Sequence, residues 1–114
     1  MLSQKFRLTG SKNFKKVQDE GRIFQSASFG IAYLDRKDEV PSRFAFIVST
    51  KISKDAVDRN RFKRTMSEAV RTSTIDLKNG FDVVFLAKQS ITRTPASDLM
   101  KEVKSSLKQA GISK

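Results

Sequence analysis

The residues best suited to chemistry lie in one short basic segment. In KDAVDRNRFKRTMSEAVR, residues 54–71, the cations Arg59, Arg61, Lys63 and Arg64 lie within six positions, with Asn60 among them. Guanidinium groups hold phosphates through paired hydrogen bonds, and an amide adds neutral donors and an acceptor. A helix that needed only solubility could scatter its charge, so this crowding indicates a polyanionic partner.

Composition points the same way and narrows the chemistry. The 114 residues carry a net charge of +11 and contain neither Cys nor His. Such an excess favours nucleic acid or an anionic surface as partner. The missing residue types remove the commonest general base, thiolate nucleophiles and Cys-rich zinc sites. We therefore expect no catalytic residue and no metal ligand, with Asp55 and Asp58 serving as helix-start caps instead.

Hydrophobic spacing predicts a single α+β domain over residues 1–114, with elements in the order αβββαβα. Helices are expected near residues 11–20, from Ala56 onward and from Pro95 onward, with Ser11 and Thr94 as N-caps. Alternating apolar residues predict an antiparallel strand pair over 27–33 and 44–48, and a short strand near 23–25. The run 81–87 is apolar on both faces, so it is expected at the centre of the sheet.

Helical spacing makes the basic segment amphipathic. One side gathers Phe62, Met66, Ala69 and Val70, and the opposite side gathers Asn60, Arg61, Arg64, Glu68 and Arg71. The first side is a predicted core face and the second a predicted basic stripe. No apolar run approaches the roughly 20 residues that span a bilayer, so a cytoplasmic protein without membrane contact is expected.

Three segments in collinear order resemble the bacterial ribonuclease P protein subunit family. They are FRLTGSKNFKKVQDEGR at 6–22, AVDRNRFKR at 56–64 and TPASDLMKEV at 94–103. The resemblance covers nearly the whole chain. It implies a small basic protein that joins a large catalytic RNA and helps it remove the 5′ leader of precursor tRNA. The RNA then carries the chemistry and requires magnesium, while the protein alone is inactive.

The same resemblance implies the fold and the first RNA-contacting surface. It implies a four-stranded sheet with three helices and a left-handed βαβ crossover through the basic helix, against the usual right-handed rule. The contacts to the catalytic RNA fall on the basic helix and the loop before it, at Lys51, Lys54, Arg59, Asn60, Arg61, Lys63, Arg64 and Arg71. Because Arg59 projects near the apolar side, a role in bracing the helix end stays open.

The second implied surface is a cleft between the first helix and the sheet, which takes the single-stranded leader. The residues expected there are Lys12, Phe14, Lys15, Gln18, Phe29 and Ile31. Unpaired bases stack on aromatic rings at roughly 1–3 kcal/mol each, whatever their sequence. Gln18 and Ala32 stand where other members of the family carry aromatic residues, so stacking is expected to be thinner in this chain.

Two other functions stay open from the sequence. A non-catalytic RNA-binding module, such as a ribosome-associated or RNA-folding protein, would carry the same basic helix without needing the cleft. A protein-only nuclease would depend on Asp35, Asp38 and Glu39, which lie in a predicted turn beside Arg36 and Lys37. The favoured hypothesis names the catalytic RNA and precursor tRNA as partners, with no protein partner.

Overall fold

The apolar run Phe81–Ala87 forms β4, which lies in the middle of a four-stranded sheet with the order β1-β2-β4-β3. It pairs antiparallel with β2, Phe29–Asp35, and parallel with β3, Arg43–Ile47. The predicted central position is therefore confirmed, whereas the predicted pairing of β2 with β3 is wrong. Alternation of apolar residues tells which face of a strand is buried, but it does not tell which strand lies beside it.

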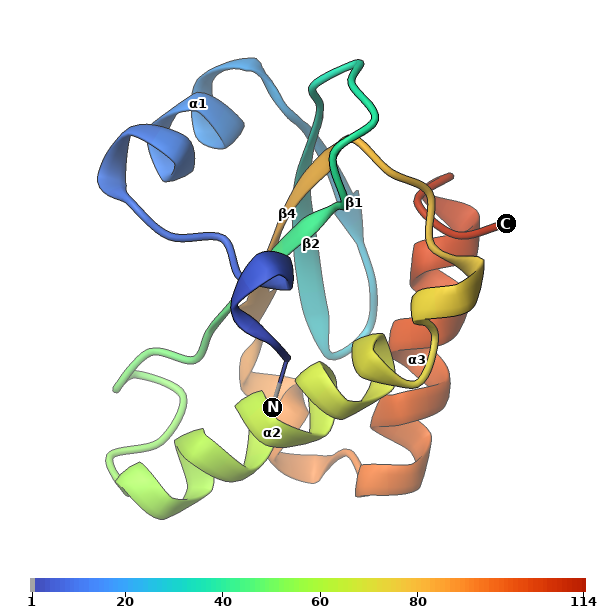
Figure 1. Ribbon diagram of the computed structural model, residues 1–114. Helices are drawn as coiled ribbons and strands as arrows, with labels where there is room; N and C mark the ends of the chain where they lie inside the picture. Colours follow the sequence, from blue (N-terminus) through green and yellow to red (C-terminus); the bar gives the residue numbers. More distant parts are fainter. Residues whose placement is uncertain (1) are drawn as a thin grey trace.

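The computed structural model describes residues 2–114. The remaining elements are η1 (Gln4–Phe6), α1 (Ser11–Glu20), β1 (Arg22–Gln25), α2 (Ala56–Arg71), η2 (Thr74–Asp76), η3 (Gln89–Arg93) and α3 (Ala96–Gln109). Helix α1 covers one face of the sheet, and α2 and α3 cover the other (Figure 1). The short strand predicted near 23–25 is β1, an edge strand paired antiparallel with β2.

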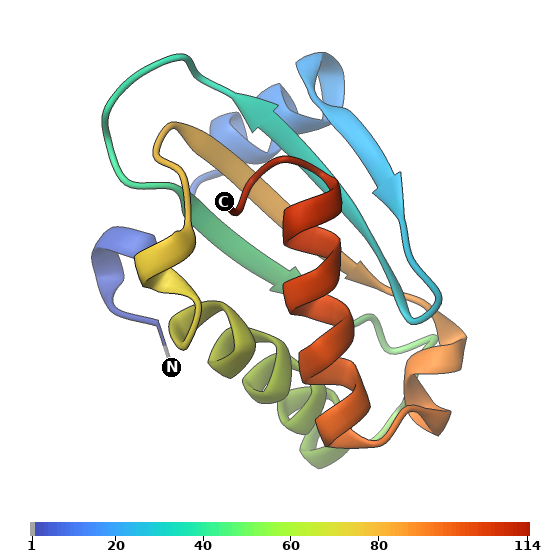
Figure 2. The ribbon, with the colours of Figure 1, turned by 90° about the vertical axis from the view of Figure 1, so that its right-hand side faces the viewer.

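Strand β3, helix α2 and strand β4 form a parallel βαβ crossover between neighbouring strands. When the sheet is seen from its α2 and α3 side with these two strands pointing upward, β4 lies to the left of β3 (Figure 2). The crossover is therefore left-handed. This is the hand that the family resemblance implies and that the general rule disfavours.

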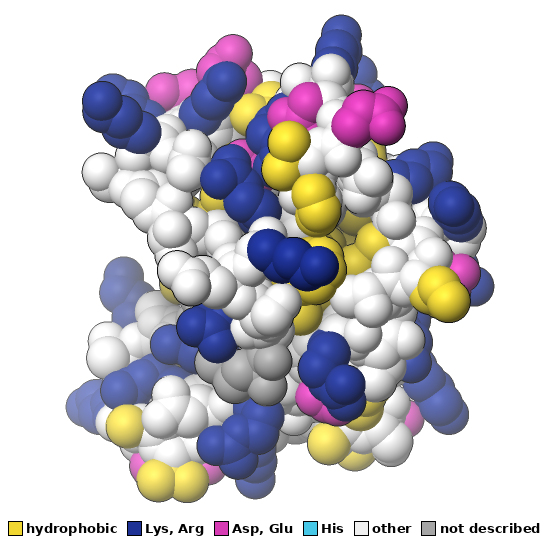
Figure 3. Space-filling model, in the orientation of Figure 1, with side chains coloured by type: hydrophobic (Ala, Val, Ile, Leu, Met, Phe, Trp, Pro, Cys, Tyr) yellow, Lys and Arg dark blue, Asp and Glu magenta, His cyan; other side chains and the backbone are white. Residues whose placement is uncertain are grey.

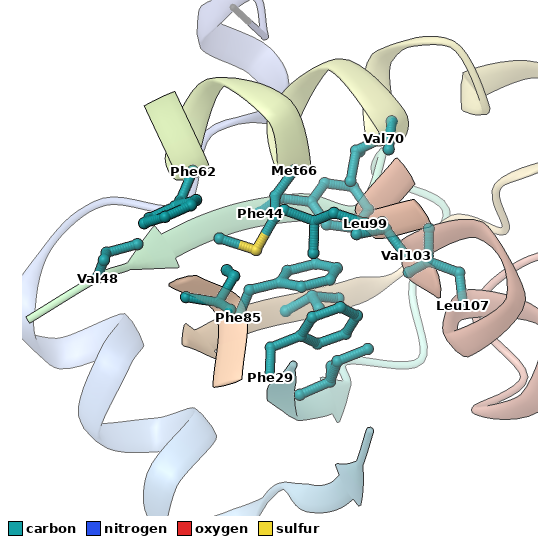
Figure 4. Packing of buried hydrophobic residues seen from close by; sticks show 14 of the residues in the cluster. Phe29, Phe44, Val48, Phe62, Met66, Val70, Phe85, Leu99, Val103 and Leu107 are labelled. Atoms are coloured by element: carbon teal, nitrogen blue, oxygen red, sulfur yellow. The ribbon is translucent and has the colours of Figure 1, made fainter. Parts of the chain in front are cut away.

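The main core lies between the sheet and the two helices α2 and α3. Figure 4 shows Phe62, Met66 and Val70 of α2 directed toward Phe44 and Phe85 of the sheet, beside Leu99 and Val103 of α3. Met66, Ala69 and Val70 are fully buried, as the predicted core face requires. The Phe85 ring packs at 5.3 Å from Phe29 and 5.1 Å from Phe46, measured between ring centroids. The core thus fixes one side of α2 and leaves the other free for a partner.

Three predicted helix caps are wrong, and one is right. Asp58 is not a cap but lies in the first turn of α2. The residue before α1 is Gly10, and Ser11 is the first residue of the helix. Pro95, rather than Thr94, immediately precedes α3, and the Thr94 hydroxyl instead lies 2.7 Å from the Ser28 hydroxyl. At α2 the Asp55 carboxylate accepts a hydrogen bond from the Val57 amide at 2.9 Å, which is the predicted cap. Ser and Thr can take part in several kinds of local hydrogen bond, so their type alone does not fix the helix start.

A second, smaller apolar cluster lies under α1. Leu8, Val17 and Val84 are its buried members, and Phe14, Ala32, Leu34 and Ala45 pack against it. Gly21, just after α1, lies so close to β2 that a Cβ there would come within 2.6 Å of the Tyr33 carbonyl oxygen. The end of α1 is therefore held against the sheet by a residue that has no side chain.

Candidate nucleic-acid interface

The start of α2 is held by two side chains, one on the residue before the helix and one on its fourth residue. Asp55 caps the helix, and the Arg59 guanidinium donates to the Ser53 carbonyl oxygen at 2.9 Å. The bracing role left open for Arg59 is thus what the structure shows for this half-buried side chain. Lys51 and Lys54 lie exposed in the same loop, so the braced loop presents two cations beside the helix.

The exposed face of α2 carries Asn60, Arg61 and Arg64, on the side away from Phe62 and Met66. Among residues 2–114, these three residues make only one ion pair, a loose one of 3.6 Å between Arg61 and Asp58, and the Arg61 side chain is 64% exposed. Within residues 2–114 the Arg64 guanidinium has no hydrogen-bond or ion-pair partner. Figure 3 shows Lys and Arg side chains gathered around the α2 end of the molecule, at the lower left. This face therefore offers cationic donors that the fold itself does not use.

Lys63 and Arg71 are less available to a partner than Asn60, Arg61 and Arg64. Lys63 is half-buried and lies beside the N-terminal segment, where it lines a small groove with Arg7 and Leu8. Arg71 is paired with Glu68 one turn earlier, with its Nε donating at 3.0 Å. That pair raises the pKa of Arg71 and lowers the pKa of Glu68 below its usual value. Arg71 consequently adds less unbalanced positive charge to the surface than Arg61 or Arg64.

A groove of about 430 Å³ runs beside the small apolar cluster under α1, with walls from α1 and from the sheet. Helix α1 contributes Phe14, Val17 and Gln18, and the strands contribute Ile23, Ala32, Ile47, Val84 and Leu86. Three of these apolar side chains stay open to solvent, with exposed fractions of 69% for Ile23, 42% for Leu86 and 40% for Ile47. Their exposure makes the groove an apolar surface that could hold a ligand with flat apolar faces, such as a nucleobase.

Of the residues predicted for this groove, Phe14 and Gln18 line it, and Lys12 and Lys15 lie exposed on the same helix. The placement of Phe29 and Ile31 in the groove is wrong, because both are fully buried in the main core. Successive side chains of a strand point to opposite faces, so Ala32 faces α1 whereas Phe29, Ile31 and Tyr33 face α2 and α3. Strand β2 does line the groove, but through Ala32, which lies on the face opposite Phe29 and Ile31.

Sequence reasoning missed five residues of the groove floor and wall, namely Ile23, Ile47, Val84, Leu86 and the buried Val17. The unusual feature of Ile23, Ile47 and Leu86 is that they are apolar but exposed, which a sequence does not reveal. For Val84 and Leu86 a signal did exist. A central strand that is apolar on both faces must show one of those faces to the α1 side.

Of the three carboxylates at the end of β2 and in the loop after it, Asp35 and Asp38 accept hydrogen bonds, whereas Glu39 accepts none among the described residues. Arg36 donates to both oxygens of Asp38, at 3.0 and 3.2 Å, and also pairs with the buried Asp82. Asp82 is held on its other side by Arg43 at 2.9 Å. The hydrogen bond from Arg36 lowers the pKa of Asp38, so this carboxyl stays ionised and is a poor general acid. Asp35 accepts from the backbone amide of Lys37. These contacts hold the β2–β3 connection.

No three acidic side chains of residues 2–114 come together in a way that could hold a metal ion. Across the same residues no helix is long and apolar enough to cross a membrane.

Comparisons with known proteins agree on one family. The family described as Ribonuclease P matches residues 2–111. The ribonuclease P protein component of Clostridioides difficile is 34% identical over 107 residues, covering 93% of this chain and 92% of the relative. The corresponding protein of Gluconacetobacter diazotrophicus is 31% identical over 113 residues, covering 98% and 97%. The solved structure of the Staphylococcus aureus RNase P protein has the same fold, with a TM-score of 0.88 at 20% identity over 96% of this chain and 98% of that one.

Proposed function

The chain belongs to the ribonuclease P protein family, and from that premise we propose that it binds the catalytic RNA through α2 and the precursor tRNA leader through the α1 groove. Members of this family are the protein component of an RNA-based enzyme that processes tRNA. Membership therefore gives the chain its association with the ribonuclease P RNA. The proposal adds which surfaces of this chain make the contacts.

The observation that carries the first contact is the unused cationic face of α2. Asn60, Arg61 and Arg64 are exposed, and among the described residues their polar ends make only two contacts, the loose ion pair of Arg61 with Asp58 and the contact of Arg61 with the Phe62 ring. Arginine holds phosphate through a planar, paired set of donors, and each neutralised phosphate releases counterions from the RNA. Helix α2 thus supports binding to an RNA backbone, with Lys51 and Lys54 adding charge at its start.

The second contact is supported by the shape and the apolar lining of the groove. A leader must be accepted whatever its sequence, and stacking or apolar packing against bases meets that requirement. Phe14 provides the aromatic ring, while Ile23, Ile47 and Leu86 provide exposed apolar surface around it. Lys12 and Lys15 on α1 would meet leader phosphates. Gln18 and Ala32 leave one aromatic ring in the groove, so apolar packing is expected to replace part of the stacking.

Catalysis is assigned to the RNA and its magnesium ions. The chain has no His or Cys, and the loop carboxylates Asp35 and Asp38 are held by hydrogen bonds within their own turn. The protein's role is then to hold precursor and catalytic RNA together, and magnesium chemistry stays with the RNA. We expect this to take place in the cytoplasm.

Reconstitution tests this function. The protein is mixed with a bacterial ribonuclease P RNA and a precursor tRNA at a magnesium concentration too low for the RNA alone to cleave. We expect cleavage at the 5′ end of the mature tRNA only when protein and RNA are both present. Cleavage by the protein without RNA, or no restoration of cleavage, would contradict the proposal.

Leader binding is tested with two precursors that differ only in leader length, one long enough to fill the groove and one of a single nucleotide. The reconstituted complex should bind the long-leader precursor more tightly, and Phe14→Ala should reduce that difference. Tyr33→Phe is the control, because Tyr33 lies on the opposite face of β2. Equal affinity for both precursors would favour the plain RNA-binding module.

A further inference from the structure

A second groove, of about 320 Å³, lies where α2 meets η3 and the start of α3. Helix α2 contributes Arg61, Phe62 and Thr65, and the segment from η3 to α3 contributes Thr92, Arg93, Thr94, Pro95, Ala96 and Leu99. It lies on the α2 and α3 side of the sheet, the side away from α1. It is therefore separate from the groove proposed for the leader.

The cations of this groove come from two different elements. Arg61 is on α2, and among residues 2–114 its only ion pair is the 3.6 Å contact with the half-buried Asp58. Arg93 ends η3 and is exposed, and in the described chain its guanidinium has neither a hydrogen bond nor an ion pair. Two guanidinium groups at one groove, with no acidic residue in its lining, form a site whose charge suits an anion.

The rest of the lining suits the remainder of a nucleotide. Phe62, Leu99 and Pro95 form the apolar part of the lining, and three threonines also line the groove. The Thr65 and Thr92 hydroxyls donate to backbone carbonyls of their own segments, so their remaining lone pairs can accept hydrogen bonds from a base or a ribose. Pockets that hold small ligands begin at about 300 Å³, which is the size of this one.

From these features we propose that the groove holds one unpaired nucleotide of the RNA, with its phosphate between Arg61 and Arg93 and its base against the exposed Pro95. This rests on the proposed RNA-binding role of α2 and extends it. Arg61 belongs to both surfaces, so an RNA strand that lies along α2 reaches this groove without a break. Arg93 thereby becomes an RNA-binding residue that lies outside the basic helix.

Two variants test the site in different ways. Arg93→Gln removes the charge, and Ala96→Leu adds bulk to the lining without changing charge. Ala96 is exposed at the first position of α3, where leucine is a good helix former. Lys104→Gln is the matched control for charge, because Lys104 is exposed on α3 and does not line the groove. Arg64→Gln reports on the proposed function itself.

Affinity for a bacterial ribonuclease P RNA is measured for each variant, together with chemical acylation of RNA 2′-hydroxyls in each complex. Arg93→Gln and Ala96→Leu should each weaken binding about three- to tenfold, and both should lose protection at the same unpaired nucleotide. Lys104→Gln should change affinity less than about twofold and keep that protection. Thermal melting confirms that each variant is folded.

The measurements distinguish a failure of the nucleotide site from a failure of the proposed RNA contact of α2. If Arg64→Gln weakens binding but Arg93→Gln and Ala96→Leu do not, the groove is not a nucleotide site and the α2 contact stands. If only Arg93→Gln weakens binding and no unpaired nucleotide loses protection, Arg93 is a general phosphate contact and the nucleotide site is wrong. If none of the three weakens binding, the proposed function of α2 fails as well.

Discussion

The Arg61 guanidinium carbon lies 5.1 Å from the centroid of the Phe62 ring, so a cation of the exposed α2 face rests on a side chain of the core. Phe62 itself is only 6% exposed. Cation–π contacts at exposed sites contribute about 0.5–1 kcal/mol, which is enough to favour one direction for a long side chain. The core thereby helps to aim a residue whose proposed partner is outside the protein.

Core and surface of α2 should nevertheless separate in mutants. Met66 is fully buried against the sheet, so Met66→Ala should lower the free energy of unfolding by roughly 2–5 kcal/mol. RNA affinity of the folded fraction should be unchanged, since Asn60, Arg61 and Arg64 remain in place. Urea unfolding beside RNA binding measures both quantities.

Met66→Leu is the control for this variant, because a swap that conserves volume should cost less than about 1.5 kcal/mol. An equal loss of stability in both variants would show that the site tolerates no change of shape and that cavity formation is not the cause. A loss of RNA affinity in folded Met66→Ala would show that the two faces of α2 are coupled.

Gly21→Ala should disturb the leader groove by shifting α1 relative to β2. A Cβ at this position would lie 2.4 Å from the Val17 carbonyl oxygen and 2.6 Å from that of Tyr33, so α1 or β2 must shift. We expect a loss of stability of about 1–3 kcal/mol, as in other overpacked sites, and a weaker dependence of precursor affinity on leader length. Glu20→Ala, at the exposed neighbouring residue, should leave both nearly unchanged. Equal stability of the two variants would contradict the close contact at Gly21.

The loop after β2 should make a small contribution to acid sensitivity. The hydrogen bond from Arg36 lowers the folded-state pKa of Asp38 below its usual 3.8. A lowered pKa gives stability that is present above the unfolded-state pKa and is lost as pH falls through the folded-state value. Asp38→Asn should therefore flatten the loss of melting temperature below about pH 4, compared with the unchanged chain.

Glu39→Gln, in the same loop, is the control for the pH experiment. Its profile should follow that of the unchanged chain, because Glu39 makes no ion pair among the described residues. If the Asp38→Asn profile also runs parallel to the unchanged one, the Arg36–Asp38 pair has no effect on folding.

Most elements of the fold could be predicted from the chain. The helical spacing of Phe62, Met66, Ala69 and Val70 gave the core face of α2, and the doubly apolar run 81–87 gave the central strand. Strand pairing could not be obtained in this way. A strand's pattern reports its buried faces, whereas the place of β4 between β2 and β3 depends on pairing between segments that are far apart in the chain.

The site was predictable where it depended on residue type and less so where it depended on side-chain direction. The cations of α2 are conspicuous in the sequence, and Asn60, Arg61 and Arg64 do lie exposed together. Phe29 and Ile31 were misplaced because both faces of β2 are apolar, so alternation did not tell which face looks toward α1. Arg93 carries no sequence signal, since only the meeting of η3 with α2 brings it beside Arg61.

The central claim is that the exposed cations of α2 bind RNA and do not hold the fold. Its most direct test compares two double variants. One combines Arg61→Gln with Arg64→Gln, and the other, the control, combines Lys101→Gln with Lys104→Gln. Both pairs remove two positive charges from exposed helix positions, so they leave the same net charge. The measurement is affinity for a bacterial ribonuclease P RNA over a range of salt concentrations, beside the melting temperature.

The account predicts that the α2 pair binds tenfold or more weakly than the unchanged protein, with a shallower dependence of affinity on salt, because fewer counterions are released. The control pair should bind within about twofold, and all three proteins should melt at nearly the same temperature. Equal weakening by both pairs would mean that net charge alone attracts the RNA. Unchanged affinity of the α2 pair, or its failure to fold, would contradict the claim.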